Sequence, residues 1–298
     1  MRLEGSIVPL VTPFKNGALD EAALQGLVER QIAAGSHGIS VGGTTGEPAG
    51  MSLSERERVI ELAVQVADGR LPVLAGSGSV NLDETLRLTR FAQGVGANAG
   101  LIITPYYVKP NQEGLYRFFA AVAAAAPDFP LVLYNIPGRA AVATEVKTLA
   151  RLAGDYPNIV GVKHSVKDLD VVSWTLKTCG RDFKVFCGLE SLTVPMLLLG
   201  GHGMIAATGN LLPREVARQY DLVKAGEVKE AVALHYHLLE INDSIFWDSN
   251  PIPLKTVMSM MGLIEKEWRP PLGPGSSELE ARLKAMAEGY GLLEAAVA

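Results

Sequence analysis

The sequence predicts an α/β protein: a (β/α)8 barrel, or TIM barrel, followed by a C-terminal helical extension. Eight short runs rich in valine, isoleucine and leucine recur along the 298 residues, with helix-like segments between them. The runs are mostly continuous in hydrophobicity, which is typical of parallel strands that are covered on both faces. Eight strand–helix units in succession fit a closed parallel barrel.

The strands are expected at residues 6–10, 38–42, 72–75, 100–104, 130–134, 159–163, 184–187 and 203–207. A helix is expected to open at residues 53–57, with Ser54 as its N-cap and Glu57, three residues later, completing a capping box. Two further helices are expected at residues 83–93 and 112–126.

The end of the chain, from about residue 214, has helical periodicity and no strand signal. We therefore place the barrel in residues 1–225 and the extension in residues 226–298. The main alternative is a doubly wound open sheet, which needs a nucleotide-binding loop. The stretch 76–81 lacks the third glycine of a dinucleotide turn, and the stretch 42–47 lacks the Gly-Lys-Ser/Thr ending of a phosphate loop.

The composition narrows the classes of function. With 27 Lys and Arg against 32 Asp and Glu the net charge is −5, so we expect no nucleic-acid and no membrane partner. No apolar stretch is long enough to span a bilayer, and residues 1–10 lack the apolar core of a signal peptide. Cys179 and Cys187 form no CxxC pair, and no cluster has metal-ligand spacing. We expect a cytoplasmic enzyme without a metal.

Two of the strand-like runs end in a side chain that can do chemistry, namely Tyr134 and Lys163. The strands of a parallel barrel point their C-terminal ends to the face where active sites are built. A lysine after a strand is most often a solvated end cap, and Tyr134 could be an ordinary half-buried core residue. A lysine that is desolvated at this rim has a lowered pKa, and its neutral amine can attack a ketone to form a Schiff base.

Loops after three strands offer groups that bind small molecules. In the loop 42–47, backbone N–H groups and the hydroxyls of Thr44 and Thr45 can bind a carboxylate, although a tight glycine turn alone also explains this stretch. Arg139 is suited to a bidentate grip on a carboxylate, or is a surface charge. Tyr107 belongs to a Tyr-Tyr pair, and such pairs in loops often pack at an interface.

Five motifs occur in order: GTTGE at 43–47, TPYY at 104–107, YNIPGR at 134–139, GVK at 161–163 and NPIPLK at 250–255. Together they resemble the dihydrodipicolinate synthase / N-acetylneuraminate lyase superfamily of pyruvate-dependent class I aldolases, and they lean toward the synthase branch. The likeness runs from about residue 5 to residue 274. Residues 164–165, 189–190 and Pro48 depart from the usual pattern of that branch, which leaves the second substrate open.

The resemblance implies a role for each matched residue. Lys163 forms the imine with pyruvate, and Tyr134 is the general acid/base. Thr45 relays protons between Tyr134 and Tyr107, and Tyr107 reaches in from a neighbouring subunit. The implied binding residues are Thr44 and Thr45 for the pyruvate carboxylate, Arg139 for the carboxylate of the second substrate, and Gly188 and Ile205, which line the pocket by backbone.

The implied reaction condenses pyruvate with aspartate 4-semialdehyde to 4-hydroxy-tetrahydrodipicolinate, on the path to lysine, in a homodimer or homotetramer. No metal or organic cofactor is implied, because the lysine imine is itself the electron sink. One alternative is a related 2-oxo acid aldolase or dehydratase that acts on a sugar acid or other substrate. An alternative of another class is a non-catalytic sensor of 2-oxo acids, which fold alone does not exclude.

The resemblance also bears on regulation, because lysine-inhibited members of the family bind lysine at the tight dimer interface. Glu84 and Tyr106 keep groups suited to lysine, whereas Arg56 would repel its ammonium. The other matching positions are Pro48, Ala49, Leu53 and Val80. We therefore expect this protein to be insensitive to lysine.

Overall fold

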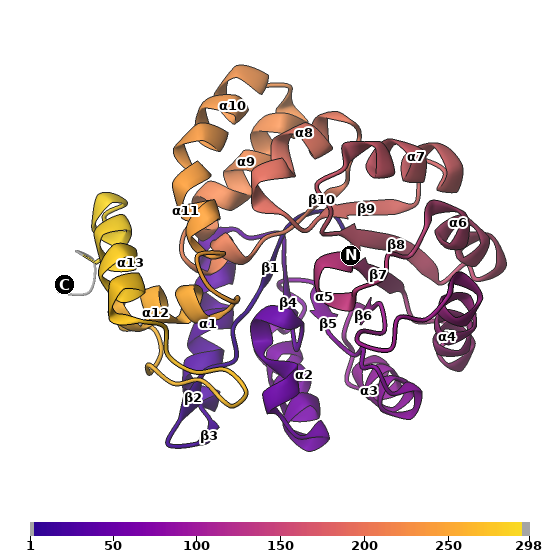
Figure 1. Ribbon diagram of the computed structural model, residues 1–298, viewed down its shortest axis with the longest axis horizontal. Coiled ribbons are helices and arrows are strands. Elements are labelled where there is room, and N and C mark those ends of the chain that lie inside the picture. The colour runs from indigo at the N-terminus through magenta and orange to yellow at the C-terminus, as the bar shows by residue number, and fades with distance from the viewer. Residues whose placement is uncertain (1–2, 294–298) are drawn as a thin grey trace.

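The computed structural model describes residues 3–293, in which eight parallel strands close into a barrel in the order β1-β10-β9-β8-β7-β6-β5-β4. Figure 1 shows this ring of strands with helices around it. The strands are β1 (Gly5–Pro9), β4 (Gly38–Val41), β5 (Val73–Ala75), β6 (Ala99–Ile103), β7 (Leu131–Asn135), β8 (Ile159–His164), β9 (Lys184–Cys187) and β10 (Gly203–Ile205). Each expected strand is present, and no end lies more than two residues from its expected position.

A short antiparallel hairpin precedes the first helix and was not expected. It pairs β2 (Phe14–Lys15) with β3 (Ala18–Leu19). Its strands are too short to show alternation, so the available signal was the turn, Asn16 and Gly17, both at positive φ. Asn-Gly is the preferred sequence for such a two-residue hairpin turn.

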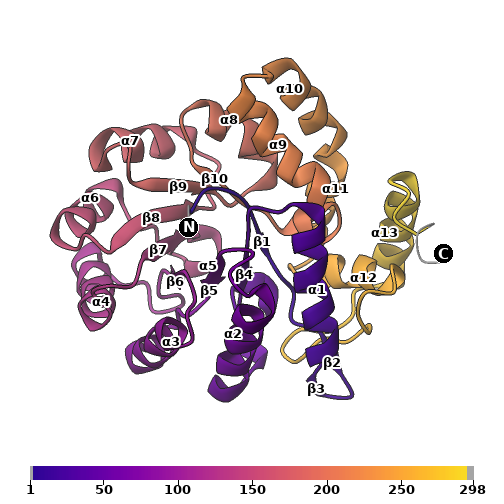
Figure 2. The same cartoon turned by 180° about the vertical axis from the view of Figure 1, so that it is seen from behind.

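The helices of the barrel lie outside the strands, as Figure 2 shows from the opposite side. They are α1 (Glu21–Ala34), α2 (Leu53–Ala67), α3 (Leu82–Gly94), α4 (Gln112–Ala125), α6 (Val146–Asp155), α7 (Leu169–Cys179), α8 (Thr193–Leu198) and α9 (Pro213–Ala225). The four-residue helix α5 (Pro137–Ala140) belongs instead to the loop between β7 and α6. Short 3-10 turns follow several strands: η1 (Thr44–Gly46), η2 (Pro48–Gly50), η3 (Glu190–Leu192) and η4 (Ala207–Asn210).

The expected N-cap of α2 was wrong by two residues. The helix begins at Leu53, so Ser52 is the cap: its Oγ accepts from the N–H of Glu55, and the Glu55 carboxylate accepts from the N–H of Ser52. The sequence contains two overlapping Ser-x-x-Glu patterns. Glu57, which belongs to the other pattern, instead binds Arg87 of α3 through both carboxylate oxygens.

The C-terminal part of the described chain is helical, as expected. It contains α10 (Val228–His237), α11 (Leu239–Ser244), α12 (Ile252–Met260) and α13 (Ser277–Gly289). Helix α11 contacts η3 and α12 contacts η4, so this part of the chain reaches loops at the C-terminal ends of the strands. In Figure 1, α12 and α13 lie to one side of the barrel.

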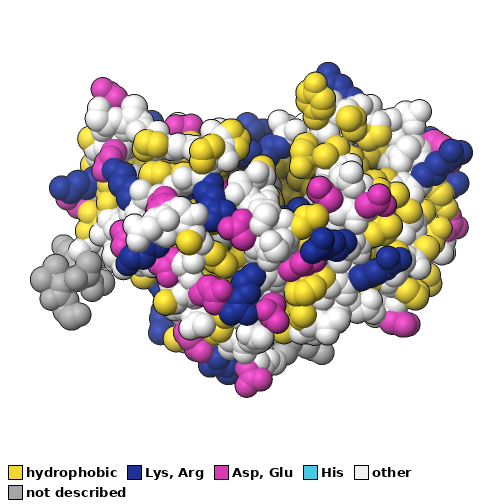
Figure 3. All heavy atoms as spheres, turned by 90° about the horizontal axis from the view of Figure 1, so that it is seen from below, with side chains coloured by type: hydrophobic (Ala, Val, Ile, Leu, Met, Phe, Trp, Pro, Cys, Tyr) yellow, Lys and Arg dark blue, Asp and Glu magenta, His cyan; other side chains and the backbone are white. Residues whose placement is uncertain are grey.

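The barrel interior is a packed core. It is filled by fully buried side chains such as Ile7, Leu74, Val132 and Phe186, and Tyr134 lies near the C-terminal ends of the strands. On the surface, Figure 3 shows basic and acidic side chains interspersed over one face. Among residues 3–293, no helix has both the length and the apolarity that crossing a membrane requires.

Candidate active site at the C-terminal face of the barrel

The amine of Lys163 and the ring of Tyr134 lie next to each other. Strands β7 and β8 are parallel neighbours, and their register pairs Tyr134 with Lys163. The Nζ of Lys163 is 4.2 Å from the centroid of the Tyr134 ring. The two residues are 7% and 5% exposed, respectively. The ammonium form is attracted to an aromatic face, so this packing holds the nitrogen at the mouth of the barrel.

Gly188 follows β9 and leaves room for the lysine side chain. A Cβ at this position would lie 2.7 Å from the Cε of Lys163 and would overlap the Oγ of Ser165. The N–H of Gly188 donates to the carbonyl of His164 at 2.8 Å, and its carbonyl accepts from the Ser165 hydroxyl at 3.0 Å. The glycine is therefore required by close packing, and its backbone is part of the wall beside Lys163.

A small cavity of about 50 Å³ lies at this point. Tyr134 and Lys163 line it together with Thr44, Thr45, Arg139, Gly188, Glu190, Ile205 and Asn250. Ile205, in β10, is buried and in register with Ile7 of β1. Seven of the eight residues expected at the site thus line one cavity.

The loop after β4 is fixed by bonds from distant parts of the chain. It begins at Gly42, with φ of 69°, and ends at Glu47, with φ of 53°. The hydroxyl of Thr45 accepts from the side-chain amide of Asn250 at 3.0 Å. The carbonyl of Gly46 accepts from the hydroxyl of Thr12 at 2.7 Å. Thr45 is therefore buried and oriented by a residue 205 positions away.

A buried ion pair holds the end of the same loop. The Nζ of Lys255, on α12, is 2.6 Å from a carboxylate oxygen of Glu47 and also donates to the carbonyl of Thr12 at 3.0 Å. The other carboxylate oxygen of Glu47 accepts from the N–H of Arg269. Burial lowers the pKa of Lys255, and Glu47 partly opposes that shift. The sequence showed Lys255 only as the end of a motif and gave no sign of this role.

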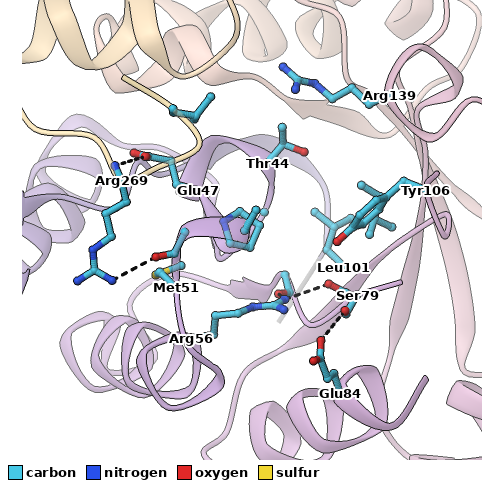
Figure 4. A pocket seen from close by; sticks show the side chains of 18 of the residues that line it. Thr44, Glu47, Met51, Arg56, Ser79, Glu84, Leu101, Tyr106, Arg139 and Arg269 are labelled. Carbon is cyan, nitrogen blue, oxygen red and sulfur yellow. Dashed lines mark hydrogen bonds between the residues drawn. The ribbon is translucent and has the colours of Figure 1, made fainter. Parts of the chain in front are cut away.

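Arg139 and Tyr107 lie further out. Arg139 is exposed, and its Nη2 donates to the backbone carbonyl of Asn250 at 3.3 Å. It also lines a larger cavity of about 660 Å³, seen in Figure 4. Tyr107 is 87% exposed with φ of 71°, and it lines neither cavity. Its expected entry into a neighbour's site stays a prediction.

Two buried polar residues beside Lys163 were not among the expected site residues. His164 contacts the side chains of Asn135 at 3.2 Å and Thr175 at 3.1 Å, and burial lowers its pKa to about 4, so the ring is neutral. Glu190 is buried, and a carboxylate oxygen accepts from the N–H of Ala207 at 2.6 Å. The sequence marked both positions only as departures from a family pattern.

Comparisons with known proteins agree with this geometry. Residues 2–289 match the model of the Dihydrodipicolinate synthetase family. A 4-hydroxy-tetrahydrodipicolinate synthase of Thermus thermophilus is 61% identical over 289 residues, which is 97% of each chain. The crystal structure of dihydrodipicolinate synthase from Aquifex aeolicus superposes with a TM-score of 0.96 at 42% identity, covering 97% of this chain and 99% of that one. With the fold, the motifs and the family model in agreement over nearly its whole length, the chain belongs to the dihydrodipicolinate synthetase family.

Proposed function

We propose that this protein is a 4-hydroxy-tetrahydrodipicolinate synthase, a class I lyase that condenses pyruvate with aspartate 4-semialdehyde. The observation that carries the proposal is the buried amine of Lys163 against the ring of Tyr134, at the rim of the barrel where active sites are built. The name of the relatives at 61% identity supports this choice of reaction within the family.

In the proposed reaction, the neutral amine of Lys163 attacks C2 of pyruvate and forms a carbinolamine. Tyr134 moves the protons that convert this adduct into an iminium ion and water. Loss of a proton from C3 gives an enamine, which forms a carbon–carbon bond to the aldehyde. The positive nitrogen accepts the electron pair of the broken C–H bond, so the lysine supplies the electron sink.

The binding groups have matching chemistry. In this proposal Thr44 and Thr45, which line the cavity of Lys163, bind the pyruvate carboxylate through hydroxyl and backbone groups. In this proposal the guanidinium of Arg139, an exposed residue that lines both cavities, binds the carboxylate of the second substrate. Gly188 and Ile205 line the same cavity as Lys163 and form part of its wall.

Borohydride trapping followed by a turnover assay tests the proposal. We expect pyruvate to give a borohydride-stable adduct on Lys163, located by mass spectrometry, and we expect turnover with aspartate 4-semialdehyde. A trapped adduct with turnover only on another aldehyde or sugar acid would identify a different 2-oxo acid aldolase. A trapped adduct with no turnover on any of these would identify a sensor.

We also propose that the active form is a homo-oligomer in which Tyr107 completes a neighbour's site. Tyr107 and Val108 are 87% and 61% exposed, and Tyr106 is 37% exposed, so a single chain leaves a cluster of large apolar side chains uncovered. One related structure is described as the first monomeric dihydrodipicolinate synthase variant. Light scattering at assay concentration is the test, and a fully active monomer would refute the proposal.

A last part of the proposal concerns lysine, which is bound in the related structure from Cyanidioschyzon merolae. The larger cavity contains six of the positions matched to the family's lysine site: Pro48, Ala49, Leu53, Arg56, Glu84 and Tyr106. Arg56 donates to the carbonyls of Gly76 and Gly78 at 3.0 and 2.9 Å (Figure 4). This cation lies where lysine would bring its own, so we propose that the enzyme is insensitive to lysine.

A further inference from the structure

The carboxyl group of Glu190 is buried next to the reactive lysine and is only half satisfied. Glu190 begins η3, three residues after β9 ends at Cys187. One carboxylate oxygen accepts from the N–H of Ala207 at 2.6 Å. The other, Oε2, is buried and has no hydrogen-bond partner among the described residues. Glu190 lines the same cavity as Lys163. A carboxyl group left this way is costly to bury, unless a charge nearby offsets the cost.

The charged groups around Glu190 are few. Burial raises the pKa of Glu190, whereas backbone N–H groups, such as that of Ala207, and the ammonium of Lys163 oppose the shift and favour the carboxylate form. The thiol of Cys187, on β9, stays neutral because burial raises its pKa to about 12. Helix α8 and the turn η4 carry no ionisable side chain. Helix α11, which contacts η3, carries Glu240 and Asp243, and both point to solvent as exposed residues.

The interaction between the two groups is reciprocal, since a charge that stabilises another is stabilised by it equally. When Glu190 is ionised, its negative charge stabilises positive charge on the nitrogen of Lys163. A positive nitrogen is present in the ammonium form and again in the iminium. Glu190 does not need to touch the substrate for this, because the interaction is between the two charges.

We propose that Glu190 is a positioning residue that acts through Lys163, its carboxylate setting the pH at which the lysine amine condenses with the 2-oxo acid. This inference rests on the proposed Schiff-base function. The carboxylate favours the protonated nitrogen, so it delays the appearance of the nucleophilic amine to higher pH. In return it stabilises the cationic iminium once that has formed.

The test is the pH dependence of borohydride trapping of pyruvate, at a pyruvate concentration below saturation. Glu190→Gln keeps the shape of the side chain and the acceptor for Ala207 but removes the charge. We expect its half-maximal trapping rate at a pH lower than in the wild type by about one unit, the usual effect of one nearby opposite charge. Glu240→Gln, the same change at an exposed position of α11, is the matched control and should leave the profile unchanged.

The outcomes separate this inference from the proposed function. No adduct with wild-type protein at any pH would refute the Schiff-base function itself. An adduct whose pH profile is the same in wild type and a folded Glu190→Gln variant would leave the function standing and overturn the role of Glu190. If Glu190→Gln does not fold, the pH profiles of Glu190→Asp and Glu190→Asn are compared instead. These two side chains are one methylene shorter and differ from each other in charge. Equal profiles in that pair would also overturn the proposal.

Discussion

Two parts of the active site are positioned in different ways. Tyr134 and Lys163 are placed by the hydrogen-bond ladder between β7 and β8, in which their backbones are direct partners. Thr44 and Thr45 are placed by a loop that depends on Asn250, Lys255 and Arg269, which lie more than 200 residues further along the chain.

Because the two parts are held by different kinds of bonds, substitutions in them should have different effects on activity and on stability. A strand ladder is formed by main-chain groups, so changing a side chain at its end leaves the ladder intact. The loop is held by side chains, among them a buried ion pair whose rupture leaves a charge unpaired. Substitutions of Tyr134 or Lys163 should therefore lower activity and leave the protein stable. Substitutions of the residues that hold the loop, such as Lys255, should lower both the stability and the affinity for substrate.

The largest effect is expected for Lys163→Ala, which removes the proposed nucleophile. Covalent capture of pyruvate should disappear. The thermal unfolding temperature should stay close to that of the wild type, because main-chain groups form the hydrogen bonds between β7 and β8. Mass spectrometry after borohydride treatment measures the capture. Lys184→Ala, at the opposite end of the neighbouring strand β9, should still be labelled. A stable adduct in Lys163→Ala would place the imine elsewhere.

Tyr134→Phe should keep the aromatic ring against the lysine and lose the hydroxyl. We expect pyruvate to bind and kcat to fall by about 10²–10⁴-fold, the usual contribution of a positioned acid/base. Steady-state kinetics with both substrates measures this. Tyr116→Phe, which removes a hydroxyl bonded to Asp155 on the outside of the barrel, is the control. A kcat near that of the wild type would make Tyr134 a core residue only.

Lys255→Met tests the second part of the site. It should lower the free energy of unfolding by about 3–5 kcal/mol, because it leaves the carboxylate of Glu47 buried without its partner. The KM for pyruvate should rise, since the loop carrying Thr45 loses its support. Denaturant unfolding and kinetics measure the two effects.

Two further variants sharpen that prediction. The double variant Glu47→Gln/Lys255→Met should recover part of the stability, because no buried charge is left unpaired. Lys266→Met breaks an exposed pair with Glu280 and should cost less than about 1 kcal/mol. Equal losses in Lys255→Met and Lys266→Met would show that the loop does not depend on the buried pair.

Arg139→Ala should act on substrate binding alone. Arg139 is exposed and bonded to the carbonyl of Asn250, so its loss should leave stability nearly unchanged. The KM for the second substrate should rise by about 10-fold or more, the worth of one charge-assisted hydrogen bond, with little change in the KM for pyruvate. Equal rises in the two KM values would contradict a role specific to the second carboxylate.

The smallest effect is expected from L-lysine, which should leave activity unchanged at physiological concentrations. Arg56 places a fixed positive charge in the cavity, and Pro48 and Leu53 offer no polar side chain. Titration of the pyruvate-dependent activity and calorimetry on the resting enzyme measure inhibition and binding separately. Inhibition at sub-millimolar lysine would show that other residues form such a site.

The barrel was predictable from the sequence, and so was the position of Tyr134 and Lys163 at the ends of two strands. Strand position depends on local hydrophobic runs, so β9 was placed at its observed bounds and the other strands within two residues. Lys163 and Tyr134 each end such a run. Because parallel strands point in the same direction, both residues were predicted to lie at the C-terminal face of the barrel. Where local signals competed, as with the two overlapping Ser-x-x-Glu patterns at α2, the sequence did not choose between them.

The sequence did not predict which polar residues are buried around Tyr134 and Lys163, because that depends on contacts between distant parts of the chain. The sequence showed Glu190 only as a departure from a family pattern and Lys255 only as the end of a motif. Both are buried in the folded protein, in which α11 contacts η3 and α12 contacts η4. The cause is the distance along the sequence between the residues that interact. Strand and helix patterns repeat over a few residues, whereas the bond from Asn250 to Thr45 and the ion pair from Lys255 to Glu47 exist only after residues more than 200 apart meet.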